Sequence, residues 1–153
     1  MSIKILSPFG PKMAKLVLPK PLVTKINTEV DKIISSKSLS AKYNYSKKLA
    51  GEVQQEIELP HTFVAKYLKK FFDSKLKLFV KQTTGKTSKK IKLKNFWVVR
   101  QFAHDYNPIH FHDGDISGVG YLKIPKNFNK GKKKYKTKGS IDFINGSRMF
   151  LNQ

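Results

Sequence analysis

The chain has 153 residues, a formal net charge of +21 and no cysteine. This length favours a single domain, and the lack of cysteine excludes disulfides and thiolate metal sites. No stretch approaches the ~20 apolar residues of a membrane-spanning helix, and the first residues lack the apolar run of a secretory signal. We therefore expect no transmembrane segment and a cytoplasmic location.

Lysine supplies almost all of the positive charge. Of 31 basic residues, only Arg100 and Arg148 are arginine. Arginine reads bases through bidentate hydrogen bonds, whereas lysine acts as a solvated point charge. The lysine-rich surface is compatible with nucleic-acid binding, and equally with a solvated surface that has no such partner.

The first 90 residues are predicted to be rich in helix. Short strands are expected at 3–6 and 13–19, separated by a Pro- and Gly-containing turn. Apolar residues at helical spacing predict a helix over 21–36, with Pro21 in its first turn. The polar segment 37–60 is interpreted as a loop.

A second, longer helix is predicted over 61–82, where aromatic and aliphatic residues recur at i, i+3 and i+4. Its opposite face is lysine. Such a helix can lie on an anionic membrane, but packing of the aromatic stripe on a sheet is the preferred interpretation. The following segment 83–90 contains Gly-Lys-Thr yet is no P-loop, because the first glycine of that motif is replaced by Val80.

From Ile91 onward the pattern changes to strands, expected at 91–103, 116–125 and 140–146, with a basic loop over 127–139. Helices followed by strands indicate an α+β fold. We therefore expect one domain over 1–153, with a helix-rich part (1–90) and a strand-rich part (91–153).

Two of the four histidines are gathered in "YNPIHFHDGD", at His110 and His112. On a strand, residues i and i+2 point to the same face, so both imidazoles can meet one ion. Two histidines and a carboxylate with open positions are typical of non-haem Fe(II). Asp115 is the candidate carboxylate. The alternative is that the histidines form an ordinary turn and that Asp113 and Asp115 are turn formers.

The segments "FWVVRQFAHDYNPIHFHDGDISGVGYLKIP" and "GSIDFINGS" resemble the 2-oxoglutarate/Fe(II)-dependent oxygenase family of marine bacteriophages. Weaker similarity extends to "PFGPKMAKLVLP" and "LAGEVQQEIEL". The resemblance implies a double-stranded β-helix, the cupin-like jelly-roll, with helices on its major sheet. It also implies Fe(II) as cofactor, 2-oxoglutarate and O2 as cosubstrates, hydroxylation of a C–H bond in an unknown substrate, and a location in the cytoplasm of an infected bacterial host.

Within that resemblance, His110, His112 and Asp115 are the predicted metal ligands, and Asn107 and Tyr121 are predicted to bind the cofactor. The sequence departs from the family pattern at two points. The family motif begins His-x-Asp or His-x-Glu, whereas this chain has His-x-His. No histidine follows His112, so the jelly-roll is expected to be truncated at its C-terminal end and the fragment to be inactive alone. The alternative functions are a non-enzymatic basic module that binds nucleic acid, or a phage structural or assembly protein.

Overall fold

A computed structural model describes residues 3–8, 10–49, 51–126 and 139–145. The chain divides into two compact units. The first combines Met1–Leu16 with Lys123–Gln153, and the second is Val17–Leu122. The boundary expected at residue 90 lies inside the second unit. No helix in the described ranges is long and apolar enough to cross a membrane.

The first unit contains a small antiparallel hairpin of β1 (Lys4–Leu6) and β2 (Met13–Lys15), in which Ile5 pairs with Ala14. Both strands fall within the segments where the sequence predicts them. Residues 140–145, where a further strand is expected, form none. The basic loop expected over 127–139 lies outside the described residues except for its last position.

The second unit begins with α1 (Lys20–Ser35), which confirms the helix predicted over 21–36. Leu22, Ile26, Val30 and Ile33 recur at helical spacing and form its buried face. Proline lies in its first turn, where its missing N–H costs no hydrogen bond. Ser36 ends this helix and caps the next, because its side chain accepts a hydrogen bond from the backbone N–H of Leu39.

The segment 37–60 is not a loop, contrary to the prediction from sequence. It forms α2 (Lys37–Lys42), a 3-10 turn at Ser46–Lys48 and strand β3 (Gln55–Glu58). β3 pairs antiparallel with β4 (Trp97–Arg100), and the register places Ile57 opposite Val98 and Glu58 opposite Trp97. Interleaved Glu and Gln conceal the strand in the sequence, but Val53, Ile57 and Leu59 are all buried.

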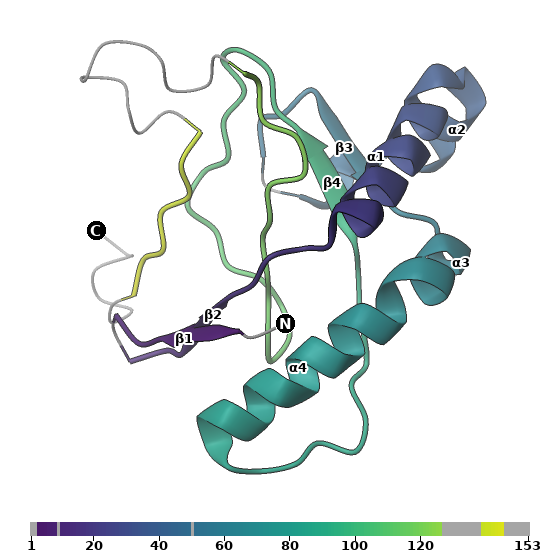
Figure 1. Ribbon diagram of the computed structural model, residues 1–153. Coiled ribbons are helices and arrows are strands. Elements are labelled where there is room, and N and C mark those ends of the chain that lie inside the picture. The colour runs from purple at the N-terminus through teal and green to yellow at the C-terminus, as the bar shows by residue number, and fades with distance from the viewer. Residues whose placement is uncertain (1–2, 9, 50, 127–138, 146–153) are drawn as a thin grey trace. The chain divides into compact units, whose positions relative to one another are not determined.

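The predicted helix over 61–82 is confirmed as one helical rod, seen in Figure 1. It comprises α3 (His61–Phe63), a π-helical turn at Val64–Leu68 and α4 (Lys69–Thr84). A π turn adds one residue to the helical repeat, which brings Phe63 and Leu68 into the core together. The helix ends at Gly85, whose left-handed φ of 70° is readily adopted by glycine.

One apolar core holds the second unit together. It joins α1, β3 and the first turns of the α3–α4 rod, so the two helical segments and the sheet share a common interior (Figure 1). The predicted packing of the aromatic stripe is thus found in its N-terminal half, where Tyr67, Phe71 and Phe72 contact the core. The buried members of this core are Leu22, Ile26, Val30, Ile33, Ile57, Leu59, Phe63 and Leu68.

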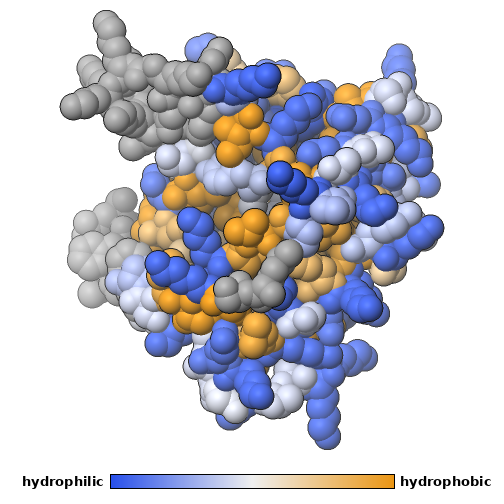
Figure 2. Space-filling model, in the orientation of Figure 1, coloured by the Kyte–Doolittle hydropathy of each residue, from blue (hydrophilic) through white to orange (hydrophobic). Residues whose placement is uncertain are grey.

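Residues 101–126 run without a regular strand, so the strand expected over 116–125 is not formed. A strand exists only where a neighbour supplies hydrogen-bond partners, and the described residues contain only two two-stranded sheets, β1–β2 and β3–β4. The jelly-roll therefore stays a prediction. Several apolar side chains of this segment are exposed, among them Phe111 at 91%. The face drawn in Figure 2 is largely hydrophilic, with apolar patches between the polar side chains.

Candidate metal centre

The histidine pair lies beside the face of the β3–β4 sheet that points away from the core. Paired residues of an antiparallel sheet share a face, and successive residues alternate. Ile57 and Val98 therefore point to the core, while Glu56 and its partner Val99, with Glu58 and Trp97, form the other face. The ring of His112 contacts Trp97 on that face, with the ring centroids 5.5 Å apart.

Trp97 connects the histidines to the body of the unit. Its other neighbour is Tyr45, which stacks on it at 5.9 Å with an interplanar angle of 27° and is 7% exposed. The rings of Tyr45, Trp97, His112 and His110 thus follow one another in a row. Trp97 is not among the residues of the main core and forms a wall of the candidate site.

The segment that carries the histidines is attached to the loop before β3. Glu52 and Tyr106 exchange two backbone hydrogen bonds, of 2.8 Å and 3.1 Å. The carboxylate of Asp105 accepts hydrogen bonds from the backbone N–H groups of Phe102 and Gln54. These bonds fix the chain on both sides of His104, which adopts a positive φ of 73°. Asp105 therefore shapes the turn that leads to His110.

The two predicted ligands His110 and His112 are brought together. Their Nε2 atoms are 3.2 Å apart. Two nitrogens that each lie about 2.1 Å from one metal ion in adjacent positions are themselves roughly 3.0–3.4 Å apart. At this distance the two rings form a hydrogen bond. The same separation is that of two ligands of a single ion, which would displace the proton that the rings share.

His110 is also held in the tautomer that a metal ligand needs. Its Nδ1 lies 2.7 Å from the carbonyl oxygen of Pro108. A carbonyl oxygen only accepts, so Nδ1 must donate, which leaves the lone pair of a neutral imidazole on Nε2. A ligand histidine typically donates its second N–H to a carbonyl or carboxylate in this way. Burial, and then the charge of His110, lower the pKa of His112, which favours the neutral ring.

Glu56 is a functional candidate that sequence reasoning missed. Its residue is 3% exposed, and its Oε2 has no hydrogen-bond partner within the described part of the chain. Burial raises the pKa of this carboxyl group, and the charge of His110 partly offsets the effect. A buried acid without a partner is costly, and such groups cluster at functional sites. The signal in the sequence was the alternation of Val53, Ile57 and Leu59, which places Glu56 on the opposite face of a strand.

Gly51 allows the neighbouring chain to approach this acid closely. A Cβ at Gly51 would collide with Oδ1 of Asn107 and would lie 3.0 Å from Oε1 of Glu56. Asn107, predicted from sequence to bind the cofactor, therefore packs against the same glycine as the buried carboxylate.

The other two predicted site residues, Asp115 and Tyr121, are exposed. Asp115 is exposed, and no hydrogen bond or ion pair joins it to either histidine. Tyr121 is 52% exposed. The next residue, Leu122, accepts a long hydrogen bond of 3.5 Å from the side chain of Asn27 on α1. Within the described residues, no three His, Cys, Asp or Glu side chains stand close enough together to hold a metal ion.

The imidazoles of His110 and His112 and the carboxylate of Glu56 are donor types that a divalent metal accepts. Their positions do not form a complete set of ligands around one ion. Two imidazoles are placed as a pair, and a carboxylate with an unpartnered oxygen is buried on the same sheet face, but these three described side chains do not stand close enough together to hold one ion. No family model, curated protein or solved structure matches this chain. Function is therefore inferred from the motif and from the side-chain geometry.

Proposed function

We propose that this chain is a homologue of the 2-oxoglutarate/Fe(II)-dependent oxygenases, in which His110 and His112 bind the iron. The observation that supports the proposal is the 3.2 Å spacing of the two Nε2 atoms, combined with the hydrogen bond that fixes the tautomer of His110. Two histidines with open positions leave room for a dicarboxylate and O2. The bound iron would supply the oxidising power for hydroxylation of a C–H bond in the substrate.

Each residue has a defined task in this proposal. His110 and His112 hold the ion through Nε2. Trp97 supports the ring of His112 through a tilted ring contact, and the carbonyl of Pro108 orients His110. Asn107 and Tyr121 are the proposed contacts for the carboxylates of 2-oxoglutarate, since an amide N–H and a phenolic O–H both donate hydrogen bonds.

Two carboxylates compete for the third ligand position. Asp115 follows the histidines closely in sequence, whereas Glu56 lies 54 positions upstream of His110 and is buried beneath the segment. We favour Glu56, because ligation would provide the partner that its Oε2 lacks. A carboxylate held out of water also gains more from a divalent cation than an exposed one.

The test is an anaerobic calorimetric titration of the metal-free chain with Fe(II), repeated with 2-oxoglutarate present. We expect one site that is lost in His110→Ala/His112→Ala. Matched single variants separate the acids: Glu56→Gln should weaken binding at least 10-fold, a typical loss when support of a site is removed, and Asp115→Asn should have little effect. Equal Fe(II) binding by the double-alanine variant would overturn the proposal, and the reverse order of the two acids would assign the ligand to Asp115.

A further inference from the structure

A shallow depression of about 430 Å³ lies between α4 and the segment that follows it. All of its lining residues belong to the second unit, and none belongs to the histidine site. We refer to it as the lysine depression. It is lined by Ala65, Lys69, Lys70, Asp73, Lys77, Lys89, Lys90 and Ile91.

The charges of the lysine depression are nearly all positive. Five of its lining residues are lysines and one is an aspartate. Asp73 pairs with Lys77 at 2.8 Å, so the other four ammonium groups have no acid within the lining. Lys69, Lys70, Lys89 and Lys90 are exposed, and a ligand can reach them without rearrangement of the fold.

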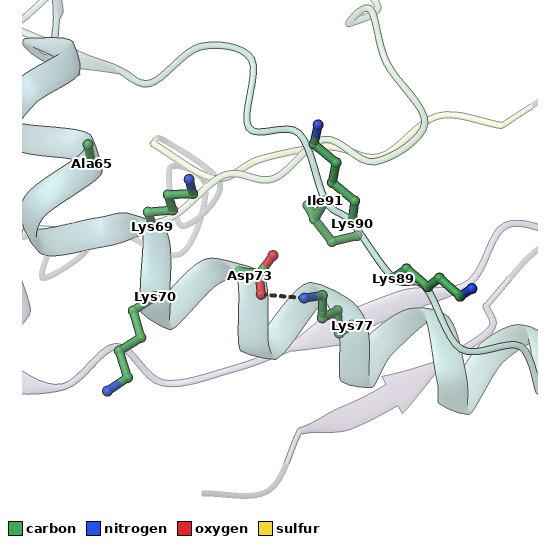
Figure 3. A pocket seen from close by; sticks show the side chains of 8 residues that line it. All are labelled: Ala65, Lys69, Lys70, Asp73, Lys77, Lys89, Lys90 and Ile91. Atoms are coloured by element: carbon green, nitrogen blue, oxygen red, sulfur yellow. Dashed lines mark ion pairs between the residues drawn. The ribbon is translucent and has the colours of Figure 1, made fainter.

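The arrangement of these lysines indicates the size of the ligand. Figure 3 shows Asp73 and Lys77 between the helix and the opposite segment, with Lys69 and Lys90 directed to one side and with Lys70 and Lys89 directed outward. A single phosphate ion requires donors that converge on one point. Here the ammonium groups surround an ion pair, and its carboxylate would repel a small anion at the centre. Because the four ammonium groups point in different directions (Figure 3), they suit several phosphates that are joined in a chain better than one small ion.

The lining also distinguishes between classes of polyanion. It contains no aromatic side chain, whereas proteins that bind single strands combine a basic groove with aromatic rings on which bases stack. It contains no arginine, the residue that reads guanine in the major groove. A membrane surface would be met by a basic face with apolar anchors, and the depression has only Ala65 and Ile91.

We propose that the lysine depression binds the phosphate backbone of duplex nucleic acid without sequence preference. Its four unpaired lysines each neutralise one phosphate, and the Asp73–Lys77 pair limits the affinity. The proposal is independent of the iron site, because it uses other residues on other elements.

The test is fluorescence anisotropy with a labelled 20-base-pair duplex over a range of salt concentrations. Counterion release predicts that log affinity falls against log salt with a slope of about −3 to −4 for four phosphates. The variant Lys69→Gln/Lys70→Gln/Lys89→Gln/Lys90→Gln should lose at least 10-fold in affinity at low salt and most of this slope. The control variant replaces the same number of exposed lysines outside the depression, Lys12, Lys20, Lys37 and Lys47, and has the same net charge.

A second pair of variants adds charge instead of removing it. Asp73→Asn frees Lys77 and should bind the duplex about 3-fold more tightly, with a slope steeper by about one. Asp31→Asn, on the exposed face of α1, changes the net charge equally and should have a smaller effect. Thermal unfolding verifies that all variants remain folded.

Four outcomes would overturn the proposal. The first is that the parent chain does not bind the duplex at low salt, and the second is that the depression variant and its control lose equal affinity for the duplex. The third is that the parent chain binds a single strand more tightly than the duplex. The fourth is that the depression variant no longer binds phosphatidylserine vesicles while its duplex binding is unchanged. The last outcome would assign the depression to a membrane surface. None of them bears on Fe(II) binding by His110 and His112, which the calorimetric titration measures separately.

Discussion

Burial of the Glu56 carboxyl group lowers the stability of the fold, and Glu56 lies on the same sheet face as Trp97 of the candidate site. Its Oε2 has no hydrogen-bond partner among the described residues, although the residue is 3% exposed. An unsatisfied buried polar group costs about 1–3 kcal/mol. On the same strand, Ile57 points to the core, and its apolar contacts stabilise the strand enough to offset the cost of the buried acid.

We predict that Glu56→Gln stabilises the metal-free chain at pH 7 by about 1 kcal/mol, because it removes a buried charge. The pKa of Glu56 is raised in the folded state. The folded chain therefore binds more protons than the unfolded chain between the unfolded pKa, near 4.5, and the higher folded value. Stability decreases as pH rises through that window, so the advantage of Glu56→Gln should be largest at pH 7 and should shrink toward pH 4.5.

Urea unfolding in the presence of a chelator, at a series of pH values, measures this difference. Glu58→Gln is the matched control, since Glu58 lies on the same face of β3, is less buried and loses the same charge. A Glu56→Gln variant that is less stable than the parent at pH 7 would show that the carboxylate makes a stabilising contact.

At the scale of elements, the stability of the second unit depends on the π turn at Val64–Leu68. Leu68 is 0% exposed and packs with α1 and β3. Leu78 lies further along the same helix, is only partly buried and is not among the residues that pack on the core. The two leucines therefore form a matched pair with different surroundings.

We predict that Leu68→Ala destabilises the chain by about 2–5 kcal/mol, the usual cost of a large-to-small change in a filled core. Leu78→Ala should cost about 1 kcal/mol or less, because water already reaches this side chain. Equilibrium unfolding in urea, followed by far-UV circular dichroism, compares the two variants. Equal losses would mean that the C-terminal half of α4 is packed as firmly as its beginning.

The elements that the sequence predicted correctly are those with long periodic patterns. Four apolar residues at helical spacing define α1, and the aromatic stripe defines the rod from His61 to Thr84. α2 was missed because its start depends on one serine that caps it, and β3 because Glu and Gln separate its apolar residues. The strands expected over 116–125 and 140–146 have suitable composition, but a ladder requires a partner that local sequence does not specify.

The candidate site was predictable only where its residues are close in sequence. The sequence predicted that His110 and His112 share one face of a strand; the segment forms no strand, yet the two imidazoles lie together. Their contact with Trp97, and the position of Glu56 on the same sheet face as Trp97, arise from the pairing of β3 with β4, which brings distant segments side by side. Because no local pattern encodes that pairing, neither the aromatic support nor the buried acid was expected.

At the scale of the whole molecule, positive charge is largely uncompensated. The formal net charge is +21. Glu29 pairs with Lys32 at 4.0 Å and Asp73 with Lys77 at 2.8 Å, whereas the sequence has 31 basic and 10 acidic residues. Like charges repel more strongly in the compact state than in the expanded unfolded chain, so the native fold bears a repulsive energy that dissolved salt can screen.

We therefore predict that Tm rises with ionic strength, since the Debye length falls from about 30 Å at 0.01 M to about 8 Å at 0.15 M. A reduction of this repulsive energy by roughly 1–2 kcal/mol would raise Tm by about 2–8 °C. Differential scanning calorimetry in NaCl over this range measures the effect.

The variant Lys12→Gln/Lys20→Gln/Lys37→Gln/Lys47→Gln provides the control for repulsion spread over the surface. It should have a higher Tm than the parent at low salt and a weaker dependence on salt, because less repulsion remains to be screened. The depression variant should behave similarly in this experiment, since repulsion depends on the number of charges, whereas only the depression variant should lose duplex binding. A Tm independent of salt in the parent chain would mean that its lysines are too well solvated to repel one another appreciably. The +21 charge would then have no measurable cost in stability.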